Sequence, residues 1–178
     1  MFEEVKIEKV EGYCKLCEDY AKKNTANPAK AAIMSCEGAC ARGEVSRRAA
    51  NLIAHKLAPQ NTVRICLGGA FTKDGGQRNL VRETHQAIAI EGCFVSCASR
   101  MMKGVIPDLK PVVINADTLY ETCLPFGVDE VCEEEINENA QIVAEIIIKK
   151  YINGCEPDMA SGECAASGGR SKSPCCSG

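Results

Sequence analysis

Two cysteines four residues apart, Cys93 and Cys97, lie in the stretch of residues 91–97. The apolar run of residues 87–90 predicts a buried strand before this stretch, and residues 98–103 predict a helix after it. If the helix begins near residue 95, both thiols point to one side, and the unpaired N–H groups of its first turn favour thiolate over thiol. A thiolate can bind a metal ion or attack an electrophile.

Other cysteines follow strands in the same way. Cys36 and Cys40 come after the apolar run of residues 31–35, and Cys66 lies near the end of the run of residues 62–67. The carboxyl ends of parallel strands meet at one edge of a sheet, where ligands bind. Cysteines that only filled a core would have no reason to favour that edge. The sequence therefore predicts a thiolate site, and its candidate metal ligands are Cys36, Cys40, Cys66, Cys93 and Cys97.

The elements that must position these thiols alternate along the chain. Strands are predicted near residues 31, 62, 87 and 111, and helices near residues 44, 77, 95 and 133. Such alternation predicts the α/β class, here a three-layer Rossmann-like or flavodoxin-like parallel sheet of about four to five strands with helices on both faces.

The chain divides into three parts by composition. Residues 1–29 form a charged N-terminal arm with the pair Cys14-x-x-Cys17, a spacing found in zinc sites and in redox motifs alike. Residues 30–154 form the α/β domain. Residues 155–178 are rich in Gly, Ser and Cys and poor in apolar residues, which predicts a disordered tail. The isolated Cys123 and Cys132 are expected to be small buried hydrophobes.

Composition excludes several classes of partner. The net charge is −3 and no basic patch with interleaved aromatics occurs, so nucleic acid is not expected. No apolar run reaches the roughly 20 residues that span a bilayer, so no membrane is expected. Thirteen cysteines are an odd number, and the N-terminus has no apolar signal region. We therefore expect a cytoplasmic protein whose cysteines bind metal or do thiol chemistry rather than form a disulfide framework.

Two functions remain open at this point. A cytoplasmic metal-binding protein would hold zinc with four thiolates at about 2.3 Å, although thiolates also suit iron–sulfur clusters, Cu(I) and, with the vicinal tail thiols, arsenite. A thiol enzyme would use Cys93 as nucleophile and another edge cysteine to resolve a disulfide or persulfide, in reduction or sulfur transfer. Composition and spacing do not decide whether the protein is an enzyme, and protein partners stay unknown.

Three short segments resemble a known family. They are Cys36-Glu37-Gly38, Cys66-Leu67-Gly68-Gly69 and, from Glu91 to Ala98, Glu-Gly-Cys-x-x-x-Cys-Ala. In this order they resemble the DGC-domain family, small bacterial and archaeal proteins for which a zinc site has been predicted. The resemblance covers about residues 30–150 of the chain.

The resemblance implies a set of zinc ligands. Carried over residue by residue, the family's ligands are Cys36, Cys66, Cys93 and Cys97. Two positions depart from the family pattern. Glu91 stands where the family has Asp, and Cys40 adds a fifth thiol. The pair Cys14/Cys17 and the cysteine-rich tail lie outside the resemblance.

Overall fold

A four-stranded, all-parallel sheet forms the centre of the protein. The computed structural model describes residues 6–8, 11–25, 30–71 and 75–154. The strands lie in the order β2-β1-β3-β4. This confirms the predicted α/β class. The strand bounds are β1 Ala31–Ser35, β2 Thr62–Arg64, β3 Gln86–Glu91 and β4 Val112–Asn115.

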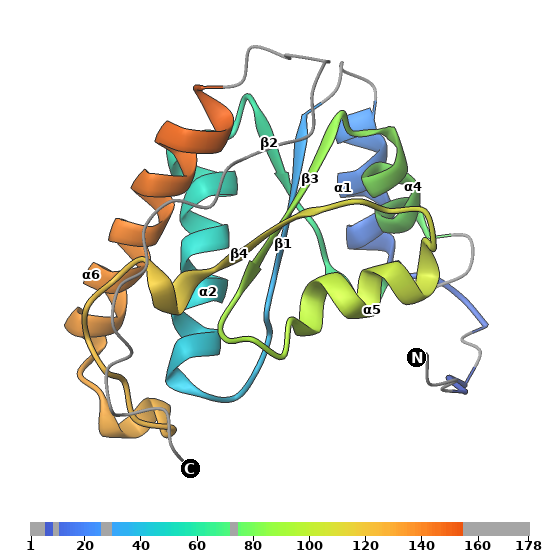
Figure 1. Ribbon diagram of the computed structural model, residues 1–178. Helices are drawn as coiled ribbons and strands as arrows, with labels where there is room; N and C mark the ends of the chain where they lie inside the picture. The colour runs from blue at the N-terminus through green and yellow to red at the C-terminus, as the bar shows by residue number, and fades with distance from the viewer. Residues whose placement is uncertain (1–5, 9–10, 26–29, 72–74, 155–178) are drawn as a thin grey trace.

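Helices cover both faces of the sheet (Figure 1). On one face lie α2 and α6, and on the other lie α1, α4 and α5. Within the described part of the chain, none of the helices has the length and apolarity needed to cross a membrane. The α-helices are α1 Lys15–Thr25, α2 Ala41–Leu52, α3 Leu67–Ala70, α4 Gly76–Glu83, α5 Cys97–Val105 and α6 Glu133–Ile147. The shorter helical segments are Ile53–Leu57, Ala116–Thr118, Val128–Glu130 and Ile148–Ile152.

Strand alternation sorts the buried side chains into two cores. On β1, Ile33 packs towards α2 and α6, whereas Met34 packs towards α1, α4 and α5. On β3, Ile88 and Ala89 divide in the same way. All five residues of β1 are buried, as expected for a strand in the middle of a sheet that helices cover on both faces.

The strand order reverses between β1 and β3. From β1 the chain runs to β2 on one side, and then returns past β1 to pair β3 on its other side. In open parallel sheets such a reversal opens a crevice beyond the carboxyl ends of the two strands, where ligands bind. Cys36 directly follows β1, and Cys93 lies in the turn that follows β3.

Glycines let three backbone segments meet at this crevice. A Cβ atom on Gly92, after β3, would lie 2.8 Å from the nitrogen of Gly43 in the first turns of α2. A Cβ atom on Gly43 would lie 2.8 Å from the carbonyl oxygen of Gly38, after β1. Contacts this short leave no room for a side chain, so the loops after β1 and β3 pack directly against the start of α2.

Helix α1 belongs to the segment expected to form an arm, and it packs on the domain. Ala21 is buried in the core on the α4 side. The carboxylate of Glu18 accepts the Gly76 N–H at 2.6 Å, and the Tyr20 hydroxyl accepts the Arg64 N–H at 3.1 Å. The division of the chain into arm, domain and tail stays a prediction, and the tail lies outside the described residues.

We predict that Gly92→Ala lowers the free energy of unfolding by about 1–3 kcal/mol, because the added methyl group overlaps the α2 backbone. Urea unfolding followed by circular dichroism measures the change. Gly104→Ala in α5 is the matched control, since nothing lies within 4 Å of the Cβ position there. The control should be neutral or stabilising by up to about 1 kcal/mol. Equal effects of the two substitutions would contradict the close packing at Gly92.

Candidate functional site

Cys36 is the most buried of the cysteines at the crevice. It continues the alternation of β1 towards the α1, α4 and α5 face, and it is 4% exposed. Its sulfur accepts the Gly38 N–H at 3.3 Å and also the N–H of Gly92. Burial raises the pKa of the Cys36 thiol, while these two hydrogen bonds act in the opposite direction and the nearby Cys97 thiol adds to the rise. The Cys97 thiol therefore lies close enough to Cys36 to act on its charge.

Cys97 is the first residue of α5, and Cys93 lies in the turn before it. Both are partly buried. The prediction that the helix begins near residue 95 is wrong by two residues. Ser96 adopts a left-handed conformation with φ 54°, which delays the helix start to the following residue.

The N–H groups at the start of α5, which the sequence analysis expected to stabilise thiolates, instead bond the carboxylate of Glu91. This glutamate is fully buried at the end of β3. Its carboxylate accepts the Ser99 N–H at 2.7 Å and the Ala98 N–H at 3.1 Å, both in the first turn of α5. A buried carboxylate needs such partners, and the helix dipole stabilises it further. Sequence reasoning noted the charge of Glu91 but missed this role, which an acidic residue at a strand-to-helix turn could have suggested.

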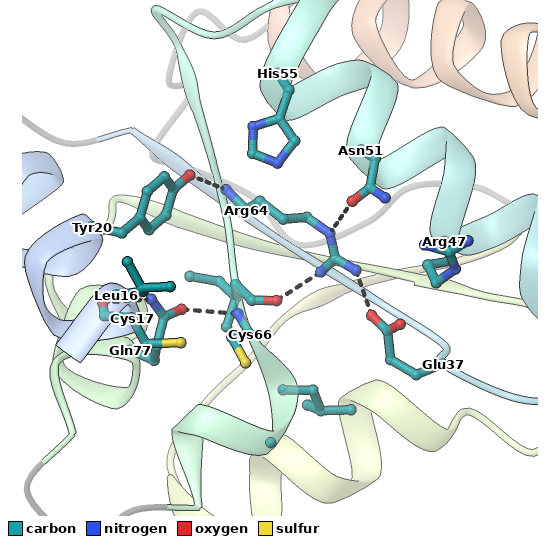
Figure 2. Close-up of a pocket in the computed structure, with 13 residues that line it drawn as sticks. Leu16, Cys17, Tyr20, Glu37, Arg47, Asn51, His55, Arg64, Cys66 and Gln77 are labelled. Carbon is teal, nitrogen blue, oxygen red and sulfur yellow. Dashed lines mark hydrogen bonds and ion pairs between the residues drawn. The ribbon is translucent and has the colours of Figure 1, made fainter. Parts of the chain in front are cut away.

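Cys66 lies in a second group of thiols, with Cys17 and Cys14 of α1 and its N-terminus. It precedes α3, and its sulfur accepts the Gly69 N–H at 3.3 Å. The thiols of Cys66 and Cys14 both lie close enough to the Cys17 thiol to raise its pKa. Figure 2 shows the Cys17 and Cys66 sulfurs facing each other beside a pocket of about 590 Å³. Cys14 and Cys17 are not among the five predicted ligands.

Cys14, which precedes α1, and Cys17 within it differ in their electrostatics. Burial, followed by the hydrogen bonds and charges of neighbouring thiols, raises the pKa of Cys17 to about 12. Cys14 is exposed, and hydrogen bonds from the backbone N–H and the thiol of Cys17 lower the pKa of Cys14. The pair therefore combines an accessible, more acidic thiol with a shielded, less acidic one, a combination that suits thiol exchange.

Arg64 fixes the spacing between the ends of β1 and β2. Its guanidinium donates to the Ser35 hydroxyl at 2.6 Å and to the Ile65 carbonyl at 2.7 Å, and it forms an ion pair with Glu37. Asn51 of α2 accepts a further hydrogen bond at 3.0 Å (Figure 2). Since Cys36 and Cys66 follow these two strands, Arg64 holds the backbones that carry both thiols. Sequence reasoning missed this network, because no pattern of residue types announces it.

Cys40 lies apart from the other candidates. It directly precedes α2, on the opposite face of the sheet, and its thiol lies near the Tyr120 hydroxyl. Burial, together with the charge of Asp117, raises the pKa of Tyr120 to about 12. In the part of the chain that the structure describes, no three His, Cys, Asp or Glu side chains converge as metal ligands do. The prediction that Cys123 and Cys132 are buried is wrong, since both are exposed.

The comparisons with known proteins concern the α/β domain. The family model of the DGC domain matches residues 32–142, which is well over half of the chain. The match includes Cys36, Cys66, Cys93 and Cys97 and excludes Cys14 and Cys17. None of the curated proteins and none of the solved structures matches the chain. The resemblance expected from three short segments is thereby confirmed.

We predict that Glu91→Gln lowers the free energy of unfolding by about 1.5–3 kcal/mol, because two charge-assisted hydrogen bonds at a buried helix start are lost. Thermal and urea unfolding measure the change. Glu138→Gln, at an exposed position on α6, should shift stability by less than about 0.5 kcal/mol. A Glu91→Gln protein as stable as the Glu138→Gln control would show that the carboxylate charge is dispensable.

We predict that iodoacetamide modifies Cys14 before Cys17 and Cys36 when reduced, chelator-treated protein is titrated between pH 6 and 9. A lowered pKa gives Cys14 more thiolate at each pH, whereas the raised pKa values of Cys17 and Cys36 leave them protonated. Peptide mass spectrometry measures the order of modification. Modification of Cys17 ahead of Cys14 would contradict the assignment.

Proposed function

Because the chain belongs to the DGC domain family, we propose that it is a cytoplasmic protein that binds zinc through cysteine thiolates at the carboxyl edge of its sheet. The observation that carries the proposal is the proximity of Cys36 and Cys97 at the crevice between β1 and β3. The proposed ligands are Cys36, Cys66, Cys93 and Cys97. Cys40 is left out because it lies on the other face of the sheet.

The surroundings of the sulfur atoms fit metal-bound thiolates. Backbone N–H groups donate to Cys36 from Gly38 and to Cys66 from Gly69, and such hydrogen bonds stabilise the negative charge of a bound thiolate. A Cβ atom on Gly38 would lie 3.2 Å from the Cys36 sulfur, and one on Gly69 would lie 3.3 Å from the Cys66 sulfur. Glycine at both positions keeps side chains away from the sulfurs, which supports the proposed ligand set.

Cysteine sulfur as the only donor favours zinc among the common divalent ions. Thiolates bind zinc tetrahedrally, whereas magnesium and calcium prefer oxygen ligands. A zinc ion with four thiolates would stabilise the fold, and one with three would keep a position open for another ligand. Because burial raises the pKa of Cys36, binding must displace a proton from this thiol. Zinc affinity should therefore rise with pH.

We predict about one tightly bound zinc per chain in protein purified without oxygen. Elemental analysis of the full-length protein should show the zinc lost in Cys36→Ser and in Cys97→Ser. Cys132→Ser is the matched control, because Cys132 is exposed, precedes α6 and is not among the proposed ligands, and it should keep the zinc.

Substitution with cobalt gives a second readout of the same site. Sulfur-to-cobalt charge-transfer bands should appear in the near ultraviolet in the wild type, and should weaken in Cys36→Ser but not in Cys132→Ser. If the purified protein contains iron and sulfide instead of zinc, the site holds an iron–sulfur cluster and the zinc proposal is refuted. Protein without metal, in which Cys36→Ser and the wild type behave alike, would refute the proposed site.

A further inference from the structure

We propose that Cys14, Cys17 and Cys66 form a relay for thiol–disulfide exchange, with Cys14 as the entry point for a disulfide substrate. Cys17 is the middle member: its thiol and that of Cys66 lie on the same side of the pocket in Figure 2, and its thiol interacts electrostatically with Cys14. Two of them lie outside the matched family domain. The relay needs no metal, so it does not depend on the proposed zinc function.

A buried glutamine fixes the two inner thiols relative to each other. Gln77 of α4 is 2% exposed. Its side-chain oxygen accepts the Cys66 N–H at 2.8 Å, and its side-chain nitrogen donates to the Cys17 carbonyl at 3.2 Å. One side chain thus joins the backbones of two cysteines that are far apart in sequence. Figure 2 shows its bond to Cys66. The contact between Cys17 and Cys66 is therefore built into the fold.

The docking of α1 supports the same arrangement. Glu18 accepts the Gly76 N–H at 2.6 Å, directly beside Gln77. A Cβ atom on Gly76 would lie 2.7 Å from the Cβ of Ala21, so the two helices are in close contact. Helix α1 therefore cannot move away from Cys66 without breaking this packing.

Substrate can reach the relay from two directions. Cys14 is exposed at the start of α1. The pocket of about 590 Å³ is lined by Cys17 and Cys66 and by Leu16, which is 81% exposed. A cavity of this size suits a small disulfide or the side chains around a protein disulfide. The substrate class that this geometry fits is an accessible disulfide.

The first exchange reduces the substrate. The Cys14 thiolate attacks one sulfur of the substrate disulfide, forms a mixed disulfide and releases the first substrate thiol. Cys17 then loses its proton and attacks the Cys14 sulfur, which releases the second substrate thiol. Two electrons pass from the pair Cys14/Cys17 to the substrate, and a Cys14–Cys17 disulfide remains.

The second exchange moves the disulfide inward. The Cys66 thiolate attacks the Cys17 sulfur, forms a Cys17–Cys66 disulfide and frees the Cys14 thiol, with no net oxidation or reduction. Two molecules of a low-molecular-weight thiol then reduce the Cys17–Cys66 disulfide by two successive exchanges and leave as their own disulfide, which restores the three thiols. If the proposed zinc function holds, the Cys17–Cys66 disulfide also removes Cys66 from the zinc ligands, so that oxidation lowers the zinc affinity.

The test uses oxidised glutathione as the substrate probe and the reduced, chelator-treated full-length protein. Samples are quenched in acid, alkylated and digested, and disulfide-linked peptides are identified by mass spectrometry. A parallel full-length background with serine at Cys155, Cys164, Cys175 and Cys176 removes exchange with those thiols. We expect Cys14–Cys17 linkage first and Cys17–Cys66 linkage later in both backgrounds.

Single substitutions separate the steps. Cys14→Ser should slow the release of glutathione about tenfold or more, because the accessible entry thiol is lost. Cys17→Ser should accumulate the mixed disulfide of Cys14 with glutathione. Cys66→Ser should stop at the Cys14–Cys17 linkage, whereas Cys132→Ser should follow the wild type. Gln77→Leu should lower the yield of Cys17–Cys66 linkage and leave Cys14–Cys17 linkage intact.

The outcomes distinguish this relay from the zinc proposal. Cys17→Ser should keep its zinc, because Cys17 is not among the proposed ligands. Loss of zinc in this variant would refute the proposed ligand set and leave the thiol exchange of the relay unaffected. Failure of Cys36→Ser to change the zinc content would refute the zinc site and leave the relay unaffected. Absence of both the Cys14–Cys17 and the Cys17–Cys66 linkages, with Cys14→Ser reacting as fast as the wild type, would overturn the relay.

Discussion

The buried carboxylate of Glu91 is the interaction on which the arrangement of the crevice depends. It accepts the N–H groups of Ala98 and Ser99, so it joins the end of β3 to the start of α5. This junction places Cys97 beside Cys36, which follows the neighbouring strand. A carboxylate without these donors would not be stable in a core, so the strand end and the helix start must form together.

Glycine backbones and a single arginine complete the frame. The close approach of Gly92 to Gly43 brings the loop after β3 against α2, and the Gly92 N–H also reaches the Cys36 sulfur. Arg64 joins the ends of β1 and β2 through Ser35 and the Ile65 carbonyl. The backbones that carry Cys36, Cys66 and Cys97 are therefore held by interactions that involve no metal.

The thiols of this frame divide into two groups with different chemistry. Cys36 is buried, its pKa is raised, and N–H groups surround its sulfur, so a positively charged ion would stabilise its thiolate. Cys14 is exposed and contacts Cys17, which in turn contacts Cys66. Because Cys66 is both a proposed zinc ligand and a member of the proposed relay, metal binding and thiol exchange would compete for it. One sheet edge can thus combine a metal-binding role with a redox-sensitive one.

The sequence by itself determined the α/β class and the approximate position of the strands, because hydrophobic runs are local properties. The run of residues 31–35 matches β1 in full. Only the tertiary structure decided which thiols meet. Cys40 follows the same strand as Cys36, but it directly precedes α2 on the other face of the sheet. The alternation of side chains within a strand does not predict the position of a residue beyond the strand end. Cys17 meets Cys66 because Gln77 and the packing of α1 on α4 bring them together, and such long-range contacts leave no periodic pattern in the sequence.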